Sequence, residues 1–325
     1  MVPSIKVGLA IRNFTPHPET PNAADLVAYA TRAEELGYES LWAWDHLLLG
    51  SARPFPVFDS LSLLSHLAAH TSRVELGIGV LVLPLRNPVE LAKVTATIDH
   101  LSGGRLILGV AAGWYRKEFD AAGVPFGRRG RVLERNLDIL YKFWTEQEVS
   151  GEADSMVFRR AVMLPKPLQS PAPTVLMGGY VDKVLRRVAT KSDGWLTYFY
   201  KPEDFVESWT KVRRYAEQAG RDPETLLSAA QLPICVADTY AEADERVRRF
   251  ISGNFDEPEW SKATADSAIR GTPEQCAEQL AEHVAAGVQH LILVPCDYDV
   301  AQIEAIATDV LPILPGRAND NAVVS

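Results

Sequence analysis

The chain alternates short apolar runs with longer segments in which apolar residues recur at helical spacing. Eight runs are typical of strands, and they cover residues 4–10, 38–44, 74–80, 105–111, 174–179, 194–199, 227–236 and 290–295. A helical segment follows each run, and we expect these helices to begin near Ala23, Asp59, Pro88, Arg131, Val181, Pro202, Ala241 and Val300. The segment 272–287 predicts a further helix before the last strand.

Local signals support several of these boundaries. Side chains that can cap a helix, prolines suited to a first turn, and glycines suited to a helix end stand at the expected places, namely Asp59, Thr272, Pro88, Pro202, Pro273, Gly37, Gly220 and Gly287. Eight strand–helix units predict an α/β fold, a closed (β/α)8 TIM barrel, because parallel strands need helical crossovers. A doubly wound open sheet is the alternative.

Three stretches interrupt the alternation, at residues 112–130, 146–173 and 251–271. We interpret them as insertions in one domain that spans residues 1–325. The second can form a short hairpin before a proline-rich approach to the fifth strand. The third is expected to be a mobile loop of the kind that often serves as a lid.

Composition narrows the range of partners. The 325 residues carry a net charge of −9, with a pI near 5.4, which argues against nucleic acid or an anionic membrane surface as a partner. The first residues lack the pattern of an export signal, and no apolar stretch is long enough to span a membrane, so we expect a cytoplasmic protein that acts on a small molecule. The three cysteines form no CxxC pair, and we expect buried thiols.

Topology sorts the histidines, because catalytic groups of a parallel barrel lie at the carboxyl ends of its strands. His70, His100 and His290 fall at the opposite end, and His17 is expected in an exposed loop. His46 directly follows the second strand, beside Asp45. It is our candidate for a general acid or base, or for a donor to a bound heterocycle; the alternative is a loop histidine fixed by Asp45.

Common metal and nucleotide motifs are missing from the sequence. His66 and His70 have the spacing of a helical metal pair but lack the glutamate of HExxH, and part of the pair lies toward the wrong end of the barrel. We therefore predict no metal site. No Walker A pattern occurs, and GVAAGW departs from GxGxxG.

Glycines and aromatic residues mark the expected ligand site. Gly178 and Gly179 end the fifth strand and lead into a helix, which would expose backbone N–H groups to a phosphate; a tight turn without a ligand is the alternative. Gly77 and Gly79 permit a bulge in a long apolar third strand. Aromatic residues gather near the same strand ends, namely Trp42, Trp44, Trp114, Tyr115, Trp195, Tyr198 and Tyr200. This concentration suits a planar apolar ligand, and we assign Trp44, Trp195 and Tyr198 to the substrate pocket.

Several extended blocks, taken together, resemble the bacterial luciferase-like family of flavin- and deazaflavin-dependent oxidoreductases. The strongest block begins LGIGVLVLPLRNPVELAKVTATIDHLSGGRLILGVAAGWYRKEF, and AEELGYESLWAWDH and PKPLQSPAPTVLMGGYVDKVLRRVATKSDGWL accompany it in the same order. The likeness runs from about residue 5 to residue 295.

The resemblance implies where a cofactor would lie. Its ring would lie over the third strand, where the family often has a cis peptide bond, here at Gly79–Val80. The loop with Gly113 and Trp114 would join the cofactor site, and Gly178–Gly179 would receive the phosphate. His46 matches the histidine of the DH pair in deazaflavin-dependent sugar-phosphate dehydrogenases, where it is a catalytic candidate, so the resemblance implies a catalytic role for Asp45 and His46. Trp114, however, replaces the acidic residue of those enzymes, which points to a more apolar substrate.

The resemblance therefore implies an oxidoreductase that uses reduced FMN or coenzyme F420 on a small, apolar organic substrate. With FMN the expected reaction is oxygen activation and monooxygenation, and with F420 it is hydride transfer. A homodimer and a separate flavin reductase are the implied partners. The alternatives are a barrel lyase or isomerase of a phosphorylated metabolite, and a non-catalytic flavin-binding protein. A group of cations either meets an acidic cofactor tail or forms a solvated segment: Arg116, Lys117, Arg128, Arg129 and Arg131.

Overall fold

The computed structural model describes residues 5–16, 18–50, 54–154, 156–198, 201–254 and 258–316. Within these residues eight parallel strands close into a barrel, in the order β9-β11-β1-β2-β3-β4-β7-β8, and β8 pairs back onto β9. Their bounds are β1 Lys6–Ala10, β2 Ser40–Ala43, β3 Glu75–Val82, β4 Leu106–Ala111, β7 Thr174–Gly178, β8 Gly194–Tyr198, β9 Leu227–Val236 and β11 His290–Pro295. The predicted TIM barrel is confirmed, and the open sheet is wrong.

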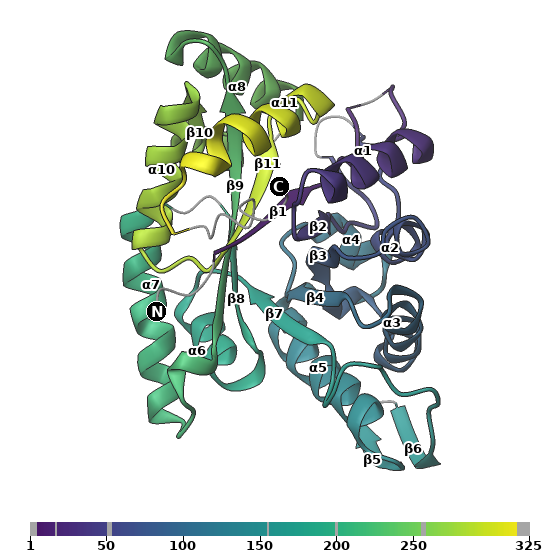
Figure 1. Ribbon diagram of the computed structural model, residues 1–325. Coiled ribbons are helices and arrows are strands. Elements are labelled where there is room, and N and C mark those ends of the chain that lie inside the picture. Colours follow the sequence, from purple (N-terminus) through teal and green to yellow (C-terminus); the bar gives the residue numbers. More distant parts are fainter. Residues whose placement is uncertain are drawn as a thin grey trace, which may run out of the picture.

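Helices cover the outside of the barrel (Figure 1). They are α1 Ala23–Glu35, α2 Ser60–Ala68, α3 Pro88–Ser102, α5 Arg129–Thr145, α6 Asp182–Lys191, α7 Pro202–Gln218, α8 Tyr240–Asn254, α10 Pro273–Ala285 and α11 Val300–Ala305. The cap signals act as predicted: Asp59 accepts from Ser62 N, and Thr272 forms a reciprocal capping box with Gln275.

The apolar core has two layers because side chains alternate across each strand. One layer fills the space between the strands and the helices. The other fills the inside of the barrel with Trp42, Ile107, Leu176, Leu196, Ala229 and Ile292, and Val80 packs against it. Since these inward side chains fill the interior, any ligand cavity must lie above them, toward the strand ends.

The three insertions form defined elements. The first contains the short helix α4, Arg116–Ala121, and the second contains the predicted hairpin, β5 Val149–Ala153 with β6 Met156–Ala161. The expectation of a mobile loop over 251–271 is corrected: α8 continues to Asn254, and α9 Pro258–Ser267 leads into β10 Ile269–Gly271, which pairs with β9. Residues 255–257 lie outside the described residues.

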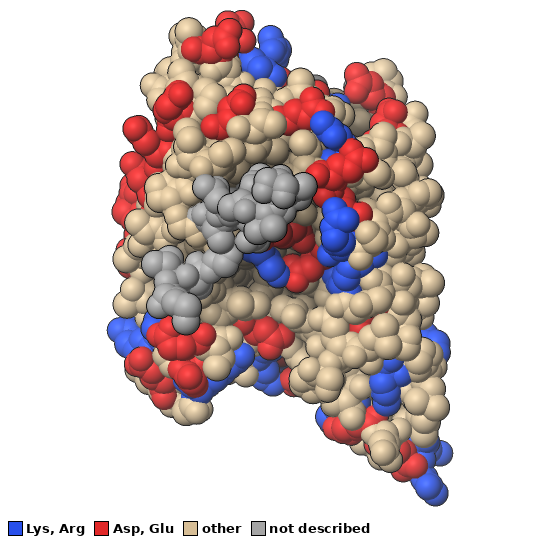
Figure 2. Space-filling view, viewed as in Figure 1, with Lys and Arg blue, Asp and Glu red and all other residues tan. Residues whose placement is uncertain are grey.

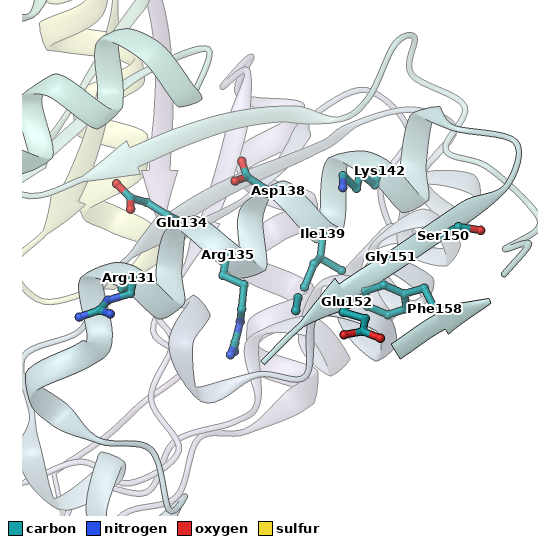
Figure 3. Close-up of a pocket in the computed structure, with 11 residues that line it drawn as sticks. Arg131, Glu134, Arg135, Asp138, Ile139, Lys142, Ser150, Gly151, Glu152 and Phe158 are labelled. Atoms are coloured by element: carbon teal, nitrogen blue, oxygen red, sulfur yellow. The ribbon is translucent and has the colours of Figure 1, made fainter. Parts of the chain in front are cut away.

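The hairpin β5–β6 projects from the body of the molecule beside the end of α5 (Figure 1). Phe158 of β6 packs edge-on against Phe143 of α5, with ring centroids 5.4 Å apart. A surface groove runs between α5 and β5, and charged side chains of both signs line it around Ile139 (Figure 3). This groove shares no lining residue with the cavity described below.

The surface agrees with the acidic composition. On the face shown in Figure 2, acidic and basic side chains are interspersed, rather than gathered into one broad basic surface. Among the described residues, no helix is both long enough and apolar enough to cross a membrane. All three cysteines are free and buried, as expected.

Two buried histidines should make the stability of this fold depend on pH. Burial lowers the pKa of His283 to about 4, against an opposing effect of Glu203, and burial together with Lys6 lowers the pKa of His290 to about 3. The unfolded chain, with pKa values near 6.5, binds these protons more readily. Stability is therefore fully present above pH 6.5 and should fall below it, by up to about 1.4 kcal/mol per pH unit for each histidine.

The pH dependence can be assigned by comparing two variants in urea unfolding across this window. His283→Leu should show a smaller loss of stability at acid pH, because it removes one of the two titrating groups. It also removes the buried Nδ1, which has no partner among the described residues. His66→Gln, on the exposed face of α2, is the control and should match the parent. A slope in His283→Leu equal to the parental slope would refute the assignment to His283.

Candidate active site

A cavity of about 290 Å³ lies at the carboxyl ends of the barrel strands, where the topology predicted the chemistry. Its lining comes from five strands, from the loops after β2, β4 and β7, and from the first turns of α5 and α6. The lining residues are Trp44, Asp45, His46, Gly79, Val80, Val82, Ala111, Ala112, Gly113, Trp114, Arg129, Gly178, Gly179, Tyr180, Val181, Val184, Leu196, Thr197, Tyr198 and Gln231. All the predicted site residues except Trp195 are therefore brought together.

Small residues explain why the cavity opens beside β3, β4 and β7. The inward positions near the ends of β4 and β7 are Gly109, Ala111 and Gly178, whereas β2 and β8 present aromatic side chains there. The side chain of Val80 occupies the space over two of these glycines: its Cγ1 lies 3.3 Å from where a Cβ of Gly109 would stand, and 3.1 Å from that of Gly178. Val80 thus forms an apolar floor.

The third strand has the features that the family resemblance implied. The Gly79–Val80 peptide bond is cis, and the register of β3 against β4 shifts between Ile78 and Leu81, which marks a bulge. From the other side of the barrel, the buried Gln231 donates from Nε2 to the Gly79 carbonyl oxygen at 3.0 Å. Gln231 therefore connects β9 to β3 at the bulge.

The turn between β7 and α6 has a shape that only glycine fits without strain. Gly179 has φ +132°, and a Cβ there would stand 3.0 Å from Val184 Cγ1. Trp195 Nε1 donates to the Gly179 carbonyl oxygen at 2.9 Å and fixes the turn from the outside. Val184 N already donates to the Val181 carbonyl oxygen at 2.7 Å, but the first N–H groups of a helix generally lack partners within the helix, so this end can accept an anion.

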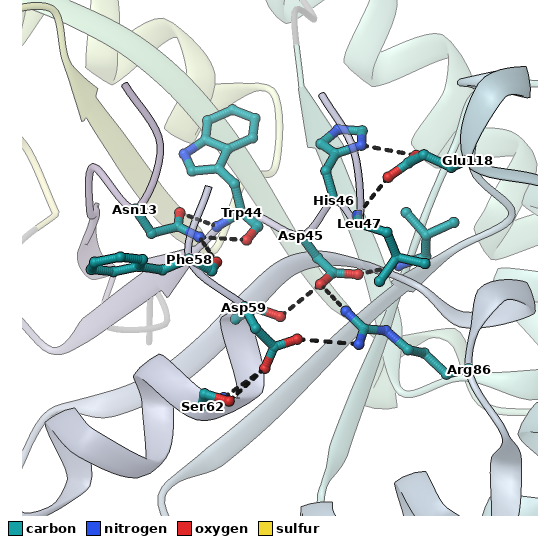
Figure 4. A network of polar contacts seen from close by, with 12 residues as sticks. Asn13, Trp44, Asp45, His46, Leu47, Phe58, Asp59, Ser62, Arg86 and Glu118 are labelled. Atoms are coloured by element: carbon teal, nitrogen blue, oxygen red, sulfur yellow. Dashed lines mark hydrogen bonds and ion pairs between the residues drawn. The ribbon is translucent and has the colours of Figure 1, made fainter. Parts of the chain in front are cut away.

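Asp45 is held in a buried polar network (Figure 4). Its Oδ1 accepts from Ser60 Oγ at 2.8 Å and from Arg86 Nη2 at 2.6 Å, and its Oδ2 accepts from Val82 N at 3.0 Å. Burial alone would lower the pKa of Arg86, but Asp45 and Asp59 outweigh it and raise that pKa. These contacts tie the loop after β2 to the end of β3.

His46 is bound by a carboxylate other than the one expected. Its Nδ1 lies 3.0 Å from Glu118 Oε2 of α4 (Figure 4), and its ring meets the Trp114 ring edge-on at 5.9 Å between centroids. Glu118 is 1% exposed, and its Oε1 accepts from Leu47 N at 2.6 Å and Leu48 N at 3.1 Å. The interpretation of a histidine fixed by Asp45 is therefore corrected, because Asp45 is bound to Arg86.

The aromatic residues divide between the cavity and the core. Trp44 and Tyr198 line the cavity and meet edge-on, with centroids 5.1 Å apart. The assignment of Trp195 to the substrate pocket is corrected: its ring is fully buried and stacks on Phe205 and Trp209 of α7, outside the barrel. Alternation along β8 gives the reason, since residues 195 and 198 must face opposite sides. His17 and Tyr200 lie outside the described residues.

The predicted group of cations is also divided. Arg129 lines the cavity, donates from Nε to the Gly113 carbonyl oxygen at 3.1 Å and lies 4.0 Å above the Phe126 ring. The guanidinium carbon of Arg116 also lies over the Phe126 ring, 4.4 Å from the ring centroid. Arg131 lines the separate groove between α5 and β5. Arg129 is therefore the member of this group that reaches the cavity.

Sequence reasoning missed Glu118, Gln231 and Arg86. Glu118 stands among the charged residues of α4, and nothing in the sequence separates it from its exposed neighbours. Gln231 could have been found, because it is a polar residue in a largely apolar strand. It stands two positions after Ala229 and therefore faces the inside of the barrel as Ala229 does.

With this geometry in view, the chain belongs to the luciferase-like monooxygenase family, whose model matches residues 5–290. The relatives include an uncharacterised protein of Mycobacterium tuberculosis, which is 29% identical over 67% of this chain and 70% of its own length. They also include the F420-dependent glucose-6-phosphate dehydrogenase of Amycolatopsis mediterranei, 26% identical over 89% of this chain and 94% of that protein.

Solved structures of low sequence identity share the fold. An F420-dependent secondary alcohol dehydrogenase, in complex with an F420–acetone adduct, matches with a TM-score of 0.81 and 18% identity over 95% of this chain and 98% of its own. The oxygenating constituent of 3,6-diketocamphane monooxygenase from Pseudomonas putida, in complex with FMN, matches with a TM-score of 0.76 and 18% identity over 96% and 99% of the two chains.

Proposed function

We propose that this chain is an oxidoreductase that binds reduced FMN or coenzyme F420 in the cavity and acts on a small, apolar organic substrate. One observation carries the proposal: a single cavity at the carboxyl ends of the strands joins an apolar floor, an anion-accepting helix end and a histidine. Family membership and the FMN- and F420-binding relatives support the choice of cofactors.

The residues present fit a planar ring with a phosphate-bearing chain. Val80 and the neighbouring glycine positions form a smooth apolar floor for the ring. Gly178, Gly179 and the first turn of α6 would hold the phosphate, with Arg129 as the nearby cation among the cavity-lining residues. When bound, F420 would supply hydride transfer, or FMN would supply oxygen activation.

The lining favours an apolar substrate over a sugar phosphate. The indole of Trp114 packs against His46 at the position where the sugar-phosphate dehydrogenases carry an acidic residue. Trp44 and Tyr198 form the adjoining aromatic wall. We therefore infer that this chain shares the cofactor chemistry of its relatives but not the sugar-phosphate substrate.

The chain's own residues would transfer a proton, exclude water from the cavity and hold the loop that carries His46. His46 lines the cavity, so its ring can exchange a proton with a substrate placed against the cofactor site. Val82 and Leu196 help exclude water, which strengthens every polar contact inside the cavity. Asp45 fixes the loop that carries His46, and its catalytic role stays a prediction.

Anaerobic titration with reduced FMN and with F420, followed by absorbance or fluorescence, tests the proposal. We expect saturable binding of at least one cofactor, and weaker binding of the same ring system without its phosphate-bearing tail, with riboflavin as the comparison for FMN. No binding of either cofactor would refute the proposal and favour a non-redox lyase or isomerase. Binding without cofactor oxidation by any substrate would favour a non-catalytic flavin-binding protein.

Two glycine variants, Gly179→Ala and Gly220→Ala, test whether the cofactor phosphate binds at the turn after β7. Gly179→Ala adds a side chain at φ +132° against Val184 and should weaken FMN binding about tenfold while affecting riboflavin less, because it disturbs the phosphate end. Gly220→Ala is the control: its φ is +74°, and nothing lies within 4 Å of the added Cβ. It should bind cofactor like the parent. Equal losses for FMN and riboflavin in Gly179→Ala would place the phosphate elsewhere.

The single-domain organisation, the cytoplasmic location, the homodimer and the flavin reductase partner stay predictions. The homodimer has one point of support on the surface. Exposed apolar side chains gather along α3 and the segment beside it, where His100 binds the Lys166 carbonyl oxygen; they are Leu101, Val162, Leu164 and Leu168. Light scattering measures the assembly mass directly.

A further inference from the structure

Glu118 reaches His46 from α4, the short helix of the insertion 112–130. The two side chains are 72 positions apart in the chain, and α4 brings them together at 3.0 Å. The same helix segment holds the loop after β2 at a further point, where Tyr115 OH donates to the Gly50 carbonyl oxygen at 2.5 Å. The insertion therefore forms one wall around His46.

The hydrogen-bond partners of Glu118 suit a carboxylate that accepts at both oxygens. Its Oε1 faces two backbone N–H groups, those of Leu47 and Leu48, which can only donate. Its Oε2 faces His46 Nδ1. An ionised carboxylate, which only accepts, satisfies all three contacts at once when Nδ1 carries a proton.

We propose that Glu118 is a positioning residue that holds His46 in its Nδ1–H tautomer, so that Nε2 acts as the proton acceptor at the cavity. In a neutral imidazole one nitrogen donates and the other accepts, so a donor at Nδ1 leaves the lone pair on Nε2. His46 lines the cavity, while Glu118 is not among the described residues that do. Glu118 therefore acts through His46 and does not touch the ligand.

The pair has a definite effect on proton transfer. When a group in the cavity gives up a proton, its O–H or N–H bond breaks, an N–H bond forms at Nε2, and the ring becomes positive. The carboxylate of Glu118 at Nδ1 offsets that charge in a buried setting. This inference rests on the proposed function only for the identity of the proton donor.

The tautomer can be measured without cofactor or substrate. Long-range ¹H–¹⁵N spectra of histidine-labelled protein, recorded at alkaline pH where imidazole is neutral, identify the protonated nitrogen; the signals that vanish in His46→Gln assign the ring. We expect Nδ1–H in the parent. Finding His46 as Nε2–H in the parent would overturn the proposal without any Glu118 variant.

Two amide substitutions on one helix complete the experiment. In Glu118→Gln, Oε1 can still accept from Leu47 and Leu48, but the amide NH₂ then faces Nδ1, so the proton should move to Nε2. Asp120→Asn makes the same chemical change at an exposed position of α4 and should leave the tautomer as in the parent. An unchanged tautomer in folded Glu118→Gln would overturn the proposal.

Kinetics then connects the tautomer to the proposed function. In protein that binds cofactor, Glu118→Gln should lower kcat at least about tenfold with little change in KM, because the ring presents the wrong nitrogen. A normal kcat despite a moved proton would refute the acceptor role of Nε2. If the parent bound no cofactor, the proposed function would fail while the tautomer measurement still tested the role of Glu118.

Discussion

Replacing His46 with alanine is expected to lower turnover about 10²- to 10⁴-fold, the usual contribution of a positioned proton-transfer group. The side chain lines the cavity from the loop after β2, whereas the glycine turn follows β7, so loss of this side chain should leave cofactor affinity nearly unchanged. Turnover is measured as oxidation of the reduced cofactor with a substrate that the parent accepts, and affinity by anaerobic titration.

The control for this substitution is a second histidine that lies outside the site. His66→Ala changes an exposed residue on α2 and should keep parental turnover. A His46→Ala protein with parental turnover would remove His46 from the mechanism. A loss of cofactor binding equal to the loss of turnover would instead make His46 a binding residue.

Replacing Asp45 with alanine is expected to cost about 3–5 kcal/mol of unfolding free energy, because it leaves a largely buried Arg86 without its closest partner. The Asp45 side chain is 1% exposed and that of Arg86 is 17% exposed. Val82 N and Ser60 Oγ lose their acceptor in the same substitution. Urea unfolding measures the cost.

A double substitution separates the ion pair from the other contacts. Asp45→Ala/Arg86→Met removes both charges and should recover part of the loss, since no uncompensated charge stays buried. A cost of less than about 1 kcal/mol for Asp45→Ala would mean that solvent screens the pair. A loss of turnover in the folded fraction as large as that of His46→Ala would support the predicted catalytic role of Asp45.

The two predictions assign a role in proton transfer to His46 and a role in stability to its neighbour Asp45. In the sequence Asp45 and His46 form a pair, and the resemblance implied that they act together. In the structure each is bound by a separate partner, Arg86 for the aspartate and Glu118 for the histidine. Adjacent residues in a loop point in different directions, so sequence adjacency gave no information about which groups share a hydrogen bond.

The sequence by itself determined the barrel, because the alternation of apolar runs and helical segments is a local property that repeats eight times along the chain. Gly79, Gly178 and Gly179 indicated a close approach of backbone and ligand, and the family resemblance supplied Val80 and the expected positions of the ring and the phosphate. Tertiary structure alone decided that Glu118 binds His46 and that Gln231 binds Gly79. These contacts join segments 72 and 152 positions apart, and their partners are set by how barrel closure brings the strand-end loops together.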